Sequence, residues 1–200
     1  MKVVLATHNA KKLTELRRLV AEQRAHLEVL GLDDVAAYPE PAETERTFEG
    51  NALLKARACL AATGLAALAD DSGIEVDLLN GMPGVRSARW AGTGASDKQN
   101  LDLLIAQLAD TEPGERTGRF VCAVAYAGPD GTVHVLRATM EGRLVSSPRG
   151  AGGFGYDPIF VADGQTRTNA ELSAAEKDAI SHRGKAVRAM LQWLSRRGEG

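Results

Sequence analysis

The fold is decided by the stretch Ala66-Ala67-Leu68-Ala69-Asp70-Asp71-Ser72-Gly73. Its apolar first half predicts a short buried strand, and this strand runs into two carboxylates, a hydroxyl and a glycine. α/β proteins place ligand-binding groups at the carboxyl ends of their strands. The stretch therefore predicts an α/β fold with a functional site where this strand ends.

The two adjacent carboxylates have different expected roles. Side chains alternate along an extended chain, so Asp70 and Asp71 should point to opposite sides, and one of them would face a given ligand. Mg²⁺ typically takes one or two protein carboxylates and completes its shell with water and substrate phosphate. The alternative is a plain loop in which Asp and Ser cap a turn.

Length and charge narrow the class of protein. A chain of 200 residues can form one large domain or two lobes around a shared sheet. Its formal net charge of -2 provides no global basic field for nucleic acid, so any anion must be met by a local cluster. Cys59 and Cys122 lie in apolar segments, which predicts buried thiols in a reducing compartment rather than a disulfide framework.

Hydropathy predicts a soluble, cytoplasmic protein that does not associate with a membrane. The apolar run in residues 1–6 is too short for a signal peptide. No later segment approaches the roughly 18 uncharged residues of a membrane span.

The amino-terminal segment has the order of elements that is typical of a phosphate-binding site, namely a strand, a polar loop and a helix. An apolar strand over residues 3–6 precedes a polar loop and then a helix with Leu13, Leu16 and Leu19 on one face. A helix start offers free N–H groups and the positive end of the helix dipole. The glycines of a Walker A loop are missing, and an ordinary capped helix with solvated lysines is the alternative. The loop consists of Thr7, His8, Asn9, Ala10, Lys11 and Lys12.

A second strand and a second helix are predicted next. Residues 27–32 favour a strand, and residues 33–46 form an acidic, proline-containing connection. A helix then opens at Thr47 and ends at Gly64. Asn51 and Lys55 are four residues apart and share one helix face, which points either at a site or at water.

The middle of the chain alternates strand and helix patterns. Residues 74–78 predict a half-buried strand, and the glycine-rich loop 80–92 that follows is typical of a functional loop or an interface. Ser96 and Gln99 fit a capping box for a packing helix through Leu108. Strands over residues 119–126 and 132–139, the second continuing through 142–145, are joined by the hairpin signal Gly128-Pro129-Asp130-Gly131.

The loop over residues 148–160 is the most unusual segment. It combines several glycines with two aromatic faces, Phe154 and Tyr156, and with the carboxylate of Asp157. Such groups suit a slot in which a planar ring stacks and its edge is read by hydrogen bonds. A tight turn with an aromatic core is the alternative.

The carboxyl-terminal region predicts helices and a basic cluster. Residues 170–177 read as helical, and Ser181 is a candidate N-cap for the last helix. Lys177, His182 and Arg183 would gather near that helix start, where they could bind anionic or carbonyl oxygens. A solvated basic patch is the alternative.

Together these segments describe a site for a nucleotide with several phosphates and Mg²⁺. In this order they closely resemble the inosine triphosphate pyrophosphatase family, whose members are also described as Ham1-like or RdgB-like, over nearly the whole chain. The matching segments are Thr7-His8-Asn9-Ala10-Lys11-Lys12, Phe48-Glu49-Gly50-Asn51-Ala52 with Lys55-Ala56, Ala69-Asp70-Asp71-Ser72-Gly73, Pro83-Gly84-Val85 with Ser87-Ala88-Arg89, Gly153-Phe154-Gly155-Tyr156-Asp157-Pro158, and Ile180-Ser181-His182-Arg183-Gly184.

The resemblance implies a fold, an activity and an assembly. The implied α/β fold has a long central mixed β-sheet with flanking helices, which form two lobes around a substrate cleft within a single domain spanning residues 1–200. The implied activity is Mg²⁺-dependent hydrolysis of ITP, dITP and XTP to the monophosphate and pyrophosphate. The implied assembly is a homodimer.

The resemblance also implies residue roles. Asp71 would be the proton acceptor and a metal ligand, and Glu40 is the best match to a second metal carboxylate. Ser72 would contact substrate, and the loop from Thr7 to Lys12 would bind the triphosphate. The remaining nucleotide-binding positions would be Phe154, Gly155, Tyr156, Asp157, Lys177, His182 and Arg183.

One residue departs from the family pattern. His8 stands in the phosphate loop where the family usually has glycine. A side chain there would crowd the phosphates if the position needs a positive φ, and it would add a donor if the position does not.

The hypothesis for mechanism follows from these roles. Asp71 would position a water for in-line attack at the α-phosphorus, while metal and lysines neutralise the charge on the departing pyrophosphate. Donors from His182 or Arg183 would favour a 6-oxo purine over adenine. The alternatives are a Maf-like pyrophosphatase of other base specificity and a non-catalytic nucleotide sensor; paired carboxylates beside a phosphate loop favour turnover.

Overall fold

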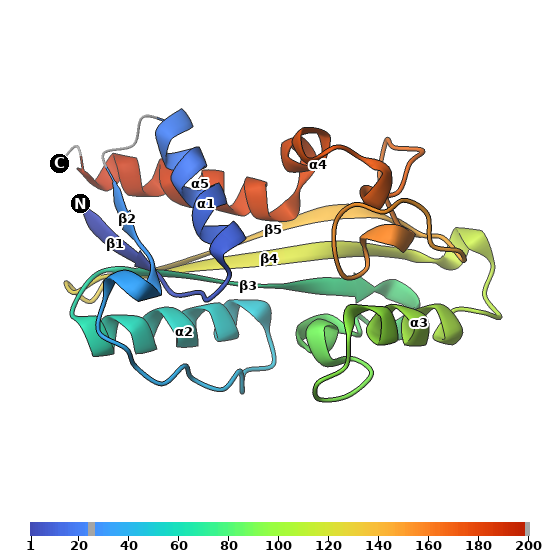
Figure 1. Cartoon of the computed structure of the whole chain (residues 1–200), viewed down its shortest axis with the longest axis horizontal. Helices are drawn as coiled ribbons and strands as arrows, with labels where there is room; N and C mark the ends of the chain where they lie inside the picture. The colour runs from blue at the N-terminus through green and yellow to red at the C-terminus, as the bar shows by residue number, and fades with distance from the viewer. Residues whose placement is uncertain (24–26, 199–200) are drawn as a thin grey trace. The chain divides into compact units, whose positions relative to one another are not determined.

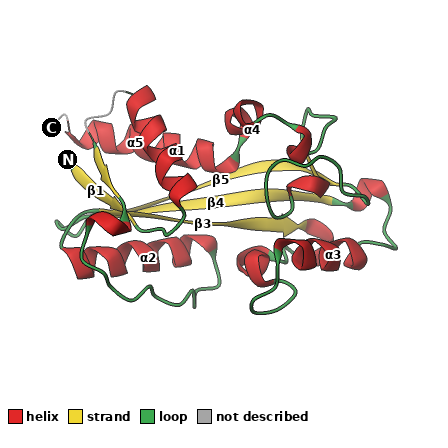
Figure 2. Ribbon diagram, viewed as in Figure 1, coloured by secondary structure: helices red, strands yellow, loops and turns green. Residues whose placement is uncertain are grey.

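The computed structural model shows a mixed sheet with helices packed on it (Figure 2), so the predicted α/β class is confirmed. It describes residues 1–23 and 27–198. The strands are β1 (Lys2–Leu5), β2 (Glu28–Leu30), β3 (Ala67–Val76), β4 (Thr117–Ala127), β5 (Val133–Leu144) and β6 (Phe160–Ala162). They form a six-stranded sheet in the order β2-β1-β3-β4-β5-β6.

The chain divides into two compact units. Unit 1 comprises Met1–Asp71, Cys122–Ala138 and Lys185–Gly200, and unit 2 comprises Ser72–Val121 and Thr139–Gly184. The strands β3, β4 and β5 contribute residues to both units.

Unit 1 contains the parallel part of the sheet. β1 pairs in parallel with β2, where Val3 is opposite Val29, and with β3, where Val4 is opposite Ala67. Figure 1 shows α1 and α5 on one side of these strands and α2 on the other. Leu5, Leu68 and residues from α1 and α5 form one buried apolar cluster. The helices of this unit are α1 (Ala10–Glu22), α2 (Phe48–Thr63) and most of α5 (His182–Gly198).

Unit 2 has its own core. Ile74 and Val76 of β3 pack in one cluster with Phe120, Phe160 and apolar residues of α3. Figure 2 shows that α3 and α4 flank the strands of this unit. The strand β6 pairs antiparallel with β5. The helices of this unit are α3 (Asp97–Gln107) and α4 (Ala174–Ile180).

Local capping signals are confirmed at several helix ends. The Thr47 hydroxyl accepts a hydrogen bond from the backbone N–H of Gly50 at 3.0 Å, and α2 ends at Gly64 in the left-handed conformation with φ 69°. Ser96 and Gln99 form the predicted capping box of α3. The predicted hairpin is also present, since the N–H of Gly128 donates to the Thr132 carbonyl at 2.8 Å between β4 and β5.

The predicted strand end at Asp70 and Asp71 is wrong. β3 is a single ten-residue strand, and both carboxylates lie within it rather than at its carboxyl end. The separately predicted strand over residues 74–78 is the second half of β3, and a short 3-10 turn begins at Asp77. The strand continues because Ile74 and Val76 are fully buried when the extended conformation is kept.

Two further predictions concern thiols and membrane association. Cys59 and Cys122 are free and buried, as their apolar surroundings predicted. Among the residues that the structure describes, no helix combines the length and apolar character that crossing a bilayer requires.

Candidate active site

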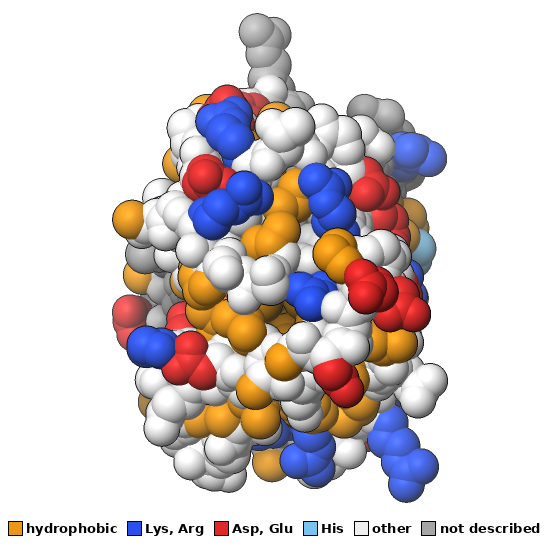
Figure 3. Space-filling view, turned by 90° about the vertical axis from the view of Figure 1, so that its right-hand side faces the viewer, with side chains coloured by type: hydrophobic (Ala, Val, Ile, Leu, Met, Phe, Trp, Pro, Cys, Tyr) orange, Lys and Arg blue, Asp and Glu red, His pale blue; other side chains and the backbone are white. Residues whose placement is uncertain are grey.

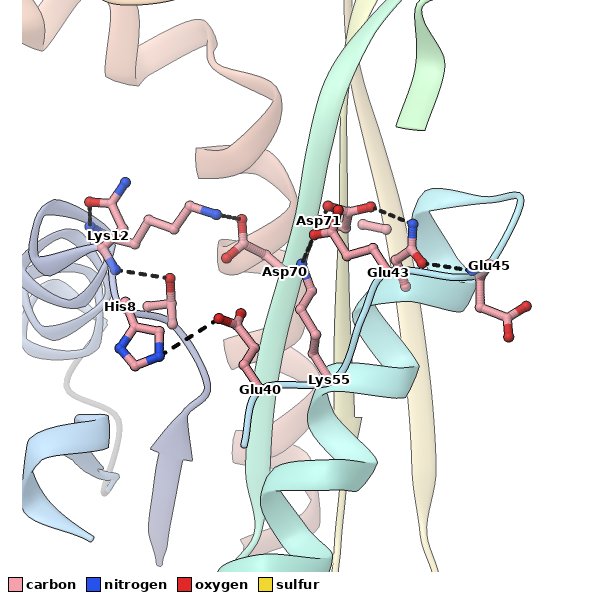
Figure 4. A network of polar contacts seen from close by, with 12 residues as sticks. His8, Lys12, Glu40, Glu43, Glu45, Lys55, Asp70 and Asp71 are labelled. Atoms are coloured by element: carbon pink, nitrogen blue, oxygen red, sulfur yellow. Dashed lines mark hydrogen bonds and ion pairs between the residues drawn. The ribbon is translucent and has the colours of Figure 1, made fainter. Parts of the chain in front are cut away.

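Asp70 and Asp71 lie on opposite faces of β3, as alternation predicted, and each contacts a lysine from a different helix of unit 1. Lys12 of α1 donates to Asp70 at 2.7 Å. Lys55 of α2 contacts Asp71 at 3.3 Å. Figure 4 shows the two lysines approaching the strand from opposite sides. One strand thus carries two separate carboxylate–lysine pairs.

The pair on the α2 side extends into a larger group, which we call the Asp71 cluster: Glu43, Asn51, Lys55 and Asp71. The Asn51 side chain donates to Asp71 at 3.1 Å, and the Lys55 ammonium donates to Glu43 at 3.0 Å. Asp71 is 9% exposed. The face of α2 that carries Asn51 and Lys55 therefore points at Asp71 and not at water.

Burial and neighbouring charge set the protonation of this cluster. Burial raises the pKa of Asp71, and the negative charge of Glu43 adds to that rise, while Lys55 and the Asn51 hydrogen bond offset part of it. Burial works to lower the pKa of Lys55, yet Asp71 and Glu43 raise it overall. Lys55 is consequently held as an ammonium between two carboxylates, and Asp71 is a stronger base than an exposed aspartate.

The predicted phosphate loop leads directly into α1, which begins at Ala10. The Thr7 hydroxyl accepts a hydrogen bond from the N–H of Asn9 at 3.2 Å, and the Asn9 side chain accepts one from the N–H of Lys12 at 3.4 Å. These bonds cap the start of α1, which is the end of a helix whose dipole favours an anion. The side chain of Lys11 lies outside the part of the chain that the structure describes.

His8 does not need the backbone conformation of glycine. Among the described residues, Asn80 is the only non-glycine residue with a positive φ. The His8 side chain is largely exposed, and its Nε2 lies 3.7 Å from the carboxylate of Glu40 (Figure 4). A side chain is therefore tolerated at this position of the loop without backbone strain.

The predicted aromatic loop in unit 2 is organised around a buried carboxylate. Asp157 is 2% exposed and accepts hydrogen bonds from the Phe154 N–H at 2.8 Å, from the Asn169 side chain at 3.2 Å and from the Lys177 ammonium. We call these four residues the Asp157 cluster. The Lys177 ammonium also lies 4.9 Å from the centre of the Phe154 ring, within cation–π range.

Two glycines allow this loop to close. Gly153 has φ +73°, and a Cβ there would collide with the Asp157 carboxylate. Gly155 has φ +57°, and its N–H donates to the side chain of Asp97 at 3.0 Å. Both positions therefore require the backbone freedom that the sequence indicated.

The expectation of two aromatic faces is wrong. Phe154 is 65% exposed, but Tyr156 is buried in the core cluster of unit 2. The Tyr156 hydroxyl donates to the Ser87 carbonyl at 2.8 Å, and burial raises its pKa. The loop thus presents one ring to solvent, while the other ring anchors it. The buried Tyr156 ring agrees with the alternative, an aromatic-cored turn, and the slot beside Phe154 stays a prediction.

The structure also gives the positions of the other residues of unit 2 that were predicted to bind substrate or to cap a helix. Ser72 follows Asp71 in β3 and is half-buried. The hydroxyl of Ser181 accepts a hydrogen bond from the Gly184 N–H at 2.9 Å, which agrees with its predicted capping role. His182 stacks on Phe120 with ring centres 5.1 Å apart, and Arg183 follows it in the first turn of α5.

Two cluster members had no predicted role. Glu43 lies in the acidic connection, where nothing in the local pattern separates it from its neighbours. Asn169 lies one residue before the predicted helical segment 170–177. The structure places it in a short 3-10 turn. Both reach their partners through contacts between distant segments, so no local signal could have identified them.

These features define an α/β protein with a buried carboxylate–lysine cluster and a capped helix start in unit 1, and with an aromatic, lysine-bearing loop in unit 2. Comparison with known proteins gives the particular family: the sequence profile of the Ham1 family matches residues 3–193. The chain belongs to the Ham1 family. The resemblance inferred from its motifs is thereby confirmed.

Individual relatives agree with this assignment. The chain is 56% identical over 192 residues to a dITP/XTP pyrophosphatase of Cutibacterium acnes, covering 95% of this chain and 94% of that protein. The crystal structure of a nucleoside-triphosphatase, dITP/XTP pyrophosphatase, from Mycobacterium abscessus matches with a TM-score of 0.82 at 49% identity, covering 96% and 99% of the two chains. The Staphylococcus aureus Ham1 protein matches with a TM-score of 0.90 at 36% identity over the full length of both chains.

Proposed function

We propose that this protein hydrolyses non-canonical purine nucleoside triphosphates, namely dITP, XTP and ITP, to the nucleoside monophosphate and pyrophosphate. The observation that carries the proposal is the Asp71 cluster, a buried carboxylate of raised pKa held beside a lysine in a member of the Ham1 family. The names of relatives about half identical over nearly their whole length support the choice of substrates.

In unit 1, the residues available to the triphosphate are the loop from Thr7 to Lys12 and the ammonium groups of Lys12 and Lys55. The helix start supplies N–H donors, and the lysines supply charge that offsets the developing charge on the leaving group. Lys12 is already oriented by Asp70, and Lys55 by Asp71 and Glu43. Their charges are therefore fixed before the substrate arrives.

Asp71 is the proposed base. Its raised pKa suits it to accept a proton from a water that attacks the α-phosphorus. The new bond joins the water oxygen to that phosphorus, the bond from the α-phosphorus to the bridging oxygen breaks, and pyrophosphate leaves. Asn51 holds the second oxygen of Asp71 and so fixes the orientation of the carboxylate.

The donor set of unit 1 fits Mg²⁺. Asp71 and Glu43 converge on one ammonium group, so two carboxylate oxygens already share a cation in this region. Among the described residues, no three His, Cys, Asp or Glu side chains gather as a metal site, but Mg²⁺ requires only one or two carboxylates. We propose Asp71 and Glu40 as its ligands, because Glu40 lines a small pocket together with Lys55, whose ammonium contacts Asp71. When bound, Mg²⁺ would supply positive charge to the phosphate oxygens.

In unit 2, the proposed role is recognition of the base. Phe154 offers an exposed ring for stacking, with Gly155, Tyr156 and Asp157 shaping the loop that carries it. His182 and Arg183 would donate to the 6-oxo group of hypoxanthine or xanthine, where adenine presents an amino group that leaves these donors unpaired. Lys177 and Ser72 complete the proposed substrate contacts.

The proposed state of the protein is a cytoplasmic homodimer. Two free, buried thiols suit a reducing compartment. The homodimer rests on the resemblance to the family and is tested by sedimentation equilibrium.

The decisive experiment is a pyrophosphate-release assay over ITP, XTP, dITP, GTP, ATP and dTTP with Mg²⁺. Rapid release from the first three alone is the expected result. Preference for dTTP or another canonical nucleotide would favour a Maf-like pyrophosphatase. Binding of ITP without release of pyrophosphate would favour a nucleotide sensor.

A further inference from the structure

Unit 2 contains a pocket that has no part in the proposed reaction. Its volume is about 170 Å³, and it lies at the carboxyl-terminal end of α3, beside the residues that follow β5. Figure 3 shows a face of the molecule on which hydrophobic side chains gather, with basic side chains among them. The pocket is lined by Ile105, Leu108, Ala109, Arg116, Val145, Ser146 and Ile159.

The one charged group in the lining is Arg116, which is 8% exposed. Its Nε donates to the Thr111 hydroxyl at 2.9 Å, and one terminal nitrogen donates to the Thr111 carbonyl at 2.6 Å. The Thr111 hydroxyl in turn donates to the Leu108 carbonyl at 2.8 Å. The guanidinium plane is therefore held in one orientation by the turn that follows α3.

The described part of the chain gives Arg116 no acidic partner. Within residues 1–23 and 27–198, no carboxylate forms an ion pair with its guanidinium, whereas the nearby Arg119 contacts Glu75, Asp77 and Glu141. Two of the five N–H groups of Arg116 serve Thr111, so three are left for another acceptor. A buried charge without a counter-ion is costly, and buried charges are normally paired.

We propose that this pocket binds a small carboxylate with a compact apolar body, and that Arg116 pairs with the carboxylate group. A planar guanidinium fixed on one edge matches a carboxylate in bidentate geometry. Ile105, Leu108, Val145 and Ile159 cover the apolar body. A cavity of about 150 Å³ accepts benzene, so a pocket of about 170 Å³ has room for a ring or a short branched chain.

The test uses benzoate as the probe and benzamide as its uncharged isostere, each titrated against the full-length protein by calorimetry and by chemical-shift perturbation. Wild-type protein is expected to bind benzoate at least tenfold more tightly than benzamide. Arg116→Gln should reduce that preference to less than twofold. Lys98→Gln, which removes an exposed positive charge from α3, should leave it unchanged.

A second variant tests the pocket even if the Arg116→Gln protein does not fold. Ala109 is exposed at the rim, so Ala109→Trp fills the pocket without touching the hydrogen bonds of Arg116. This variant should weaken both probes at least tenfold. The proposal is overturned if wild-type protein does not bind benzoate at millimolar concentrations, if benzamide binds equally well, or if both variants bind benzoate as wild type does.

Discussion

Asp71 in unit 1 and Asp157 in unit 2 are both buried aspartates next to a lysine, but their surroundings differ. Asp157 receives three N–H donors, one of which is the charged Lys177 ammonium, and among the described residues no second carboxylate shares that ammonium. Asp71 shares the Lys55 ammonium with Glu43, so two carboxylates compete for one cation. Burial and Glu43 raise the pKa of Asp71 as a result.

The difference separates two uses of the same side chain. The carboxylate of Asp157 holds a loop in place, because each of its donors comes from a different segment of unit 2. The carboxylate of Asp71 retains capacity for a proton or a further cation. We therefore expect substitution of Asp157 to reduce stability, and substitution of Asp71 to reduce catalysis.

The largest expected effect is on the turnover of Asp71→Asn. Loss of a general base typically costs 10²–10⁴-fold, so kcat for ITP should fall about 10³-fold while KM changes by less than about threefold. The free energy of unfolding should change by less than about 1 kcal/mol, since the raised pKa means that burial already disfavours the ionised form. Initial rates of pyrophosphate release and urea unfolding at pH 7 measure both quantities.

The matched control for this substitution is Glu45→Gln, which removes an exposed carboxylate from the segment that leads to α2. Its rate should equal that of wild type. A wild-type rate in Asp71→Asn would contradict the assignment of Asp71 as base.

Asp157→Asn should have the largest effect on stability. Removing one partner of a buried ion pair costs about 3–5 kcal/mol, and we expect a loss near 3 kcal/mol in the free energy of unfolding because Asn can retain part of the hydrogen bonding. Urea unfolding followed by circular dichroism measures this loss. Asp163→Asn, at an exposed aspartate of the same unit, should stay within about 0.5 kcal/mol of wild type.

His182→Ala should change base preference more than rate. Loss of a donor to the 6-oxo group is expected to reduce the ratio of kcat/KM for ITP over ATP about tenfold, which corresponds to about 1.4 kcal/mol. Phe120→Leu removes the ring against which His182 stacks and should give a smaller change in the same direction. An unchanged ratio in His182→Ala would exclude it as the residue that reads the base.

The smallest effect concerns stability in acid. The Thr117 hydroxyl and Arg119 lower the pKa of Asp77, and Arg119 lowers the pKa of Glu141 against the opposing effect of burial. Groups with a lowered pKa stabilise the fold above their unfolded pKa, near 4, and lose this contribution as pH falls through the folded value. The side chains of Asp77 and Glu141 are 42% and 47% exposed, so solvent screening limits the total to about 1 kcal/mol.

Arg119→Gln tests this acid dependence. At pH 7 the variant should be about 1 kcal/mol less stable than wild type, and the difference should shrink as pH is lowered from 5 to 3. Urea unfolding at each pH measures it. A difference that stays constant over this range would show that Arg119 acts through packing and not through Asp77 and Glu141.

Features specified by neighbouring residues could be predicted from the sequence. The cap at Thr47, the end of α2 at Gly64, the capping box at Ser96 and the hairpin between β4 and β5 each depend on a few adjacent side chains. The opposite directions of Asp70 and Asp71 follow in the same way from the alternation of an extended chain. All of these expectations agree with the structure.

Features set by distant segments could not be predicted. β3 continues past Asp71 because the core of unit 2 buries Ile74 and Val76, and β6 is a fully buried three-residue strand without any alternation. A sequence cannot distinguish an aromatic ring that faces solvent from one that packs inside, so Phe154 and Tyr156 received the same interpretation. Glu43 was missed because its partner Lys55 lies twelve residues away on a helix.

Because β3 runs without a break through Asp70 and Asp71, the register of this strand determines which lysine each carboxylate contacts. Inserting or deleting one residue of β3 ahead of Asp70 would turn both aspartates to the opposite faces of the strand. Asp70 would then face Lys55, and Asp71 would face Lys12. Length changes should therefore be tolerated in the loops before Ala67 far better than within the strand itself.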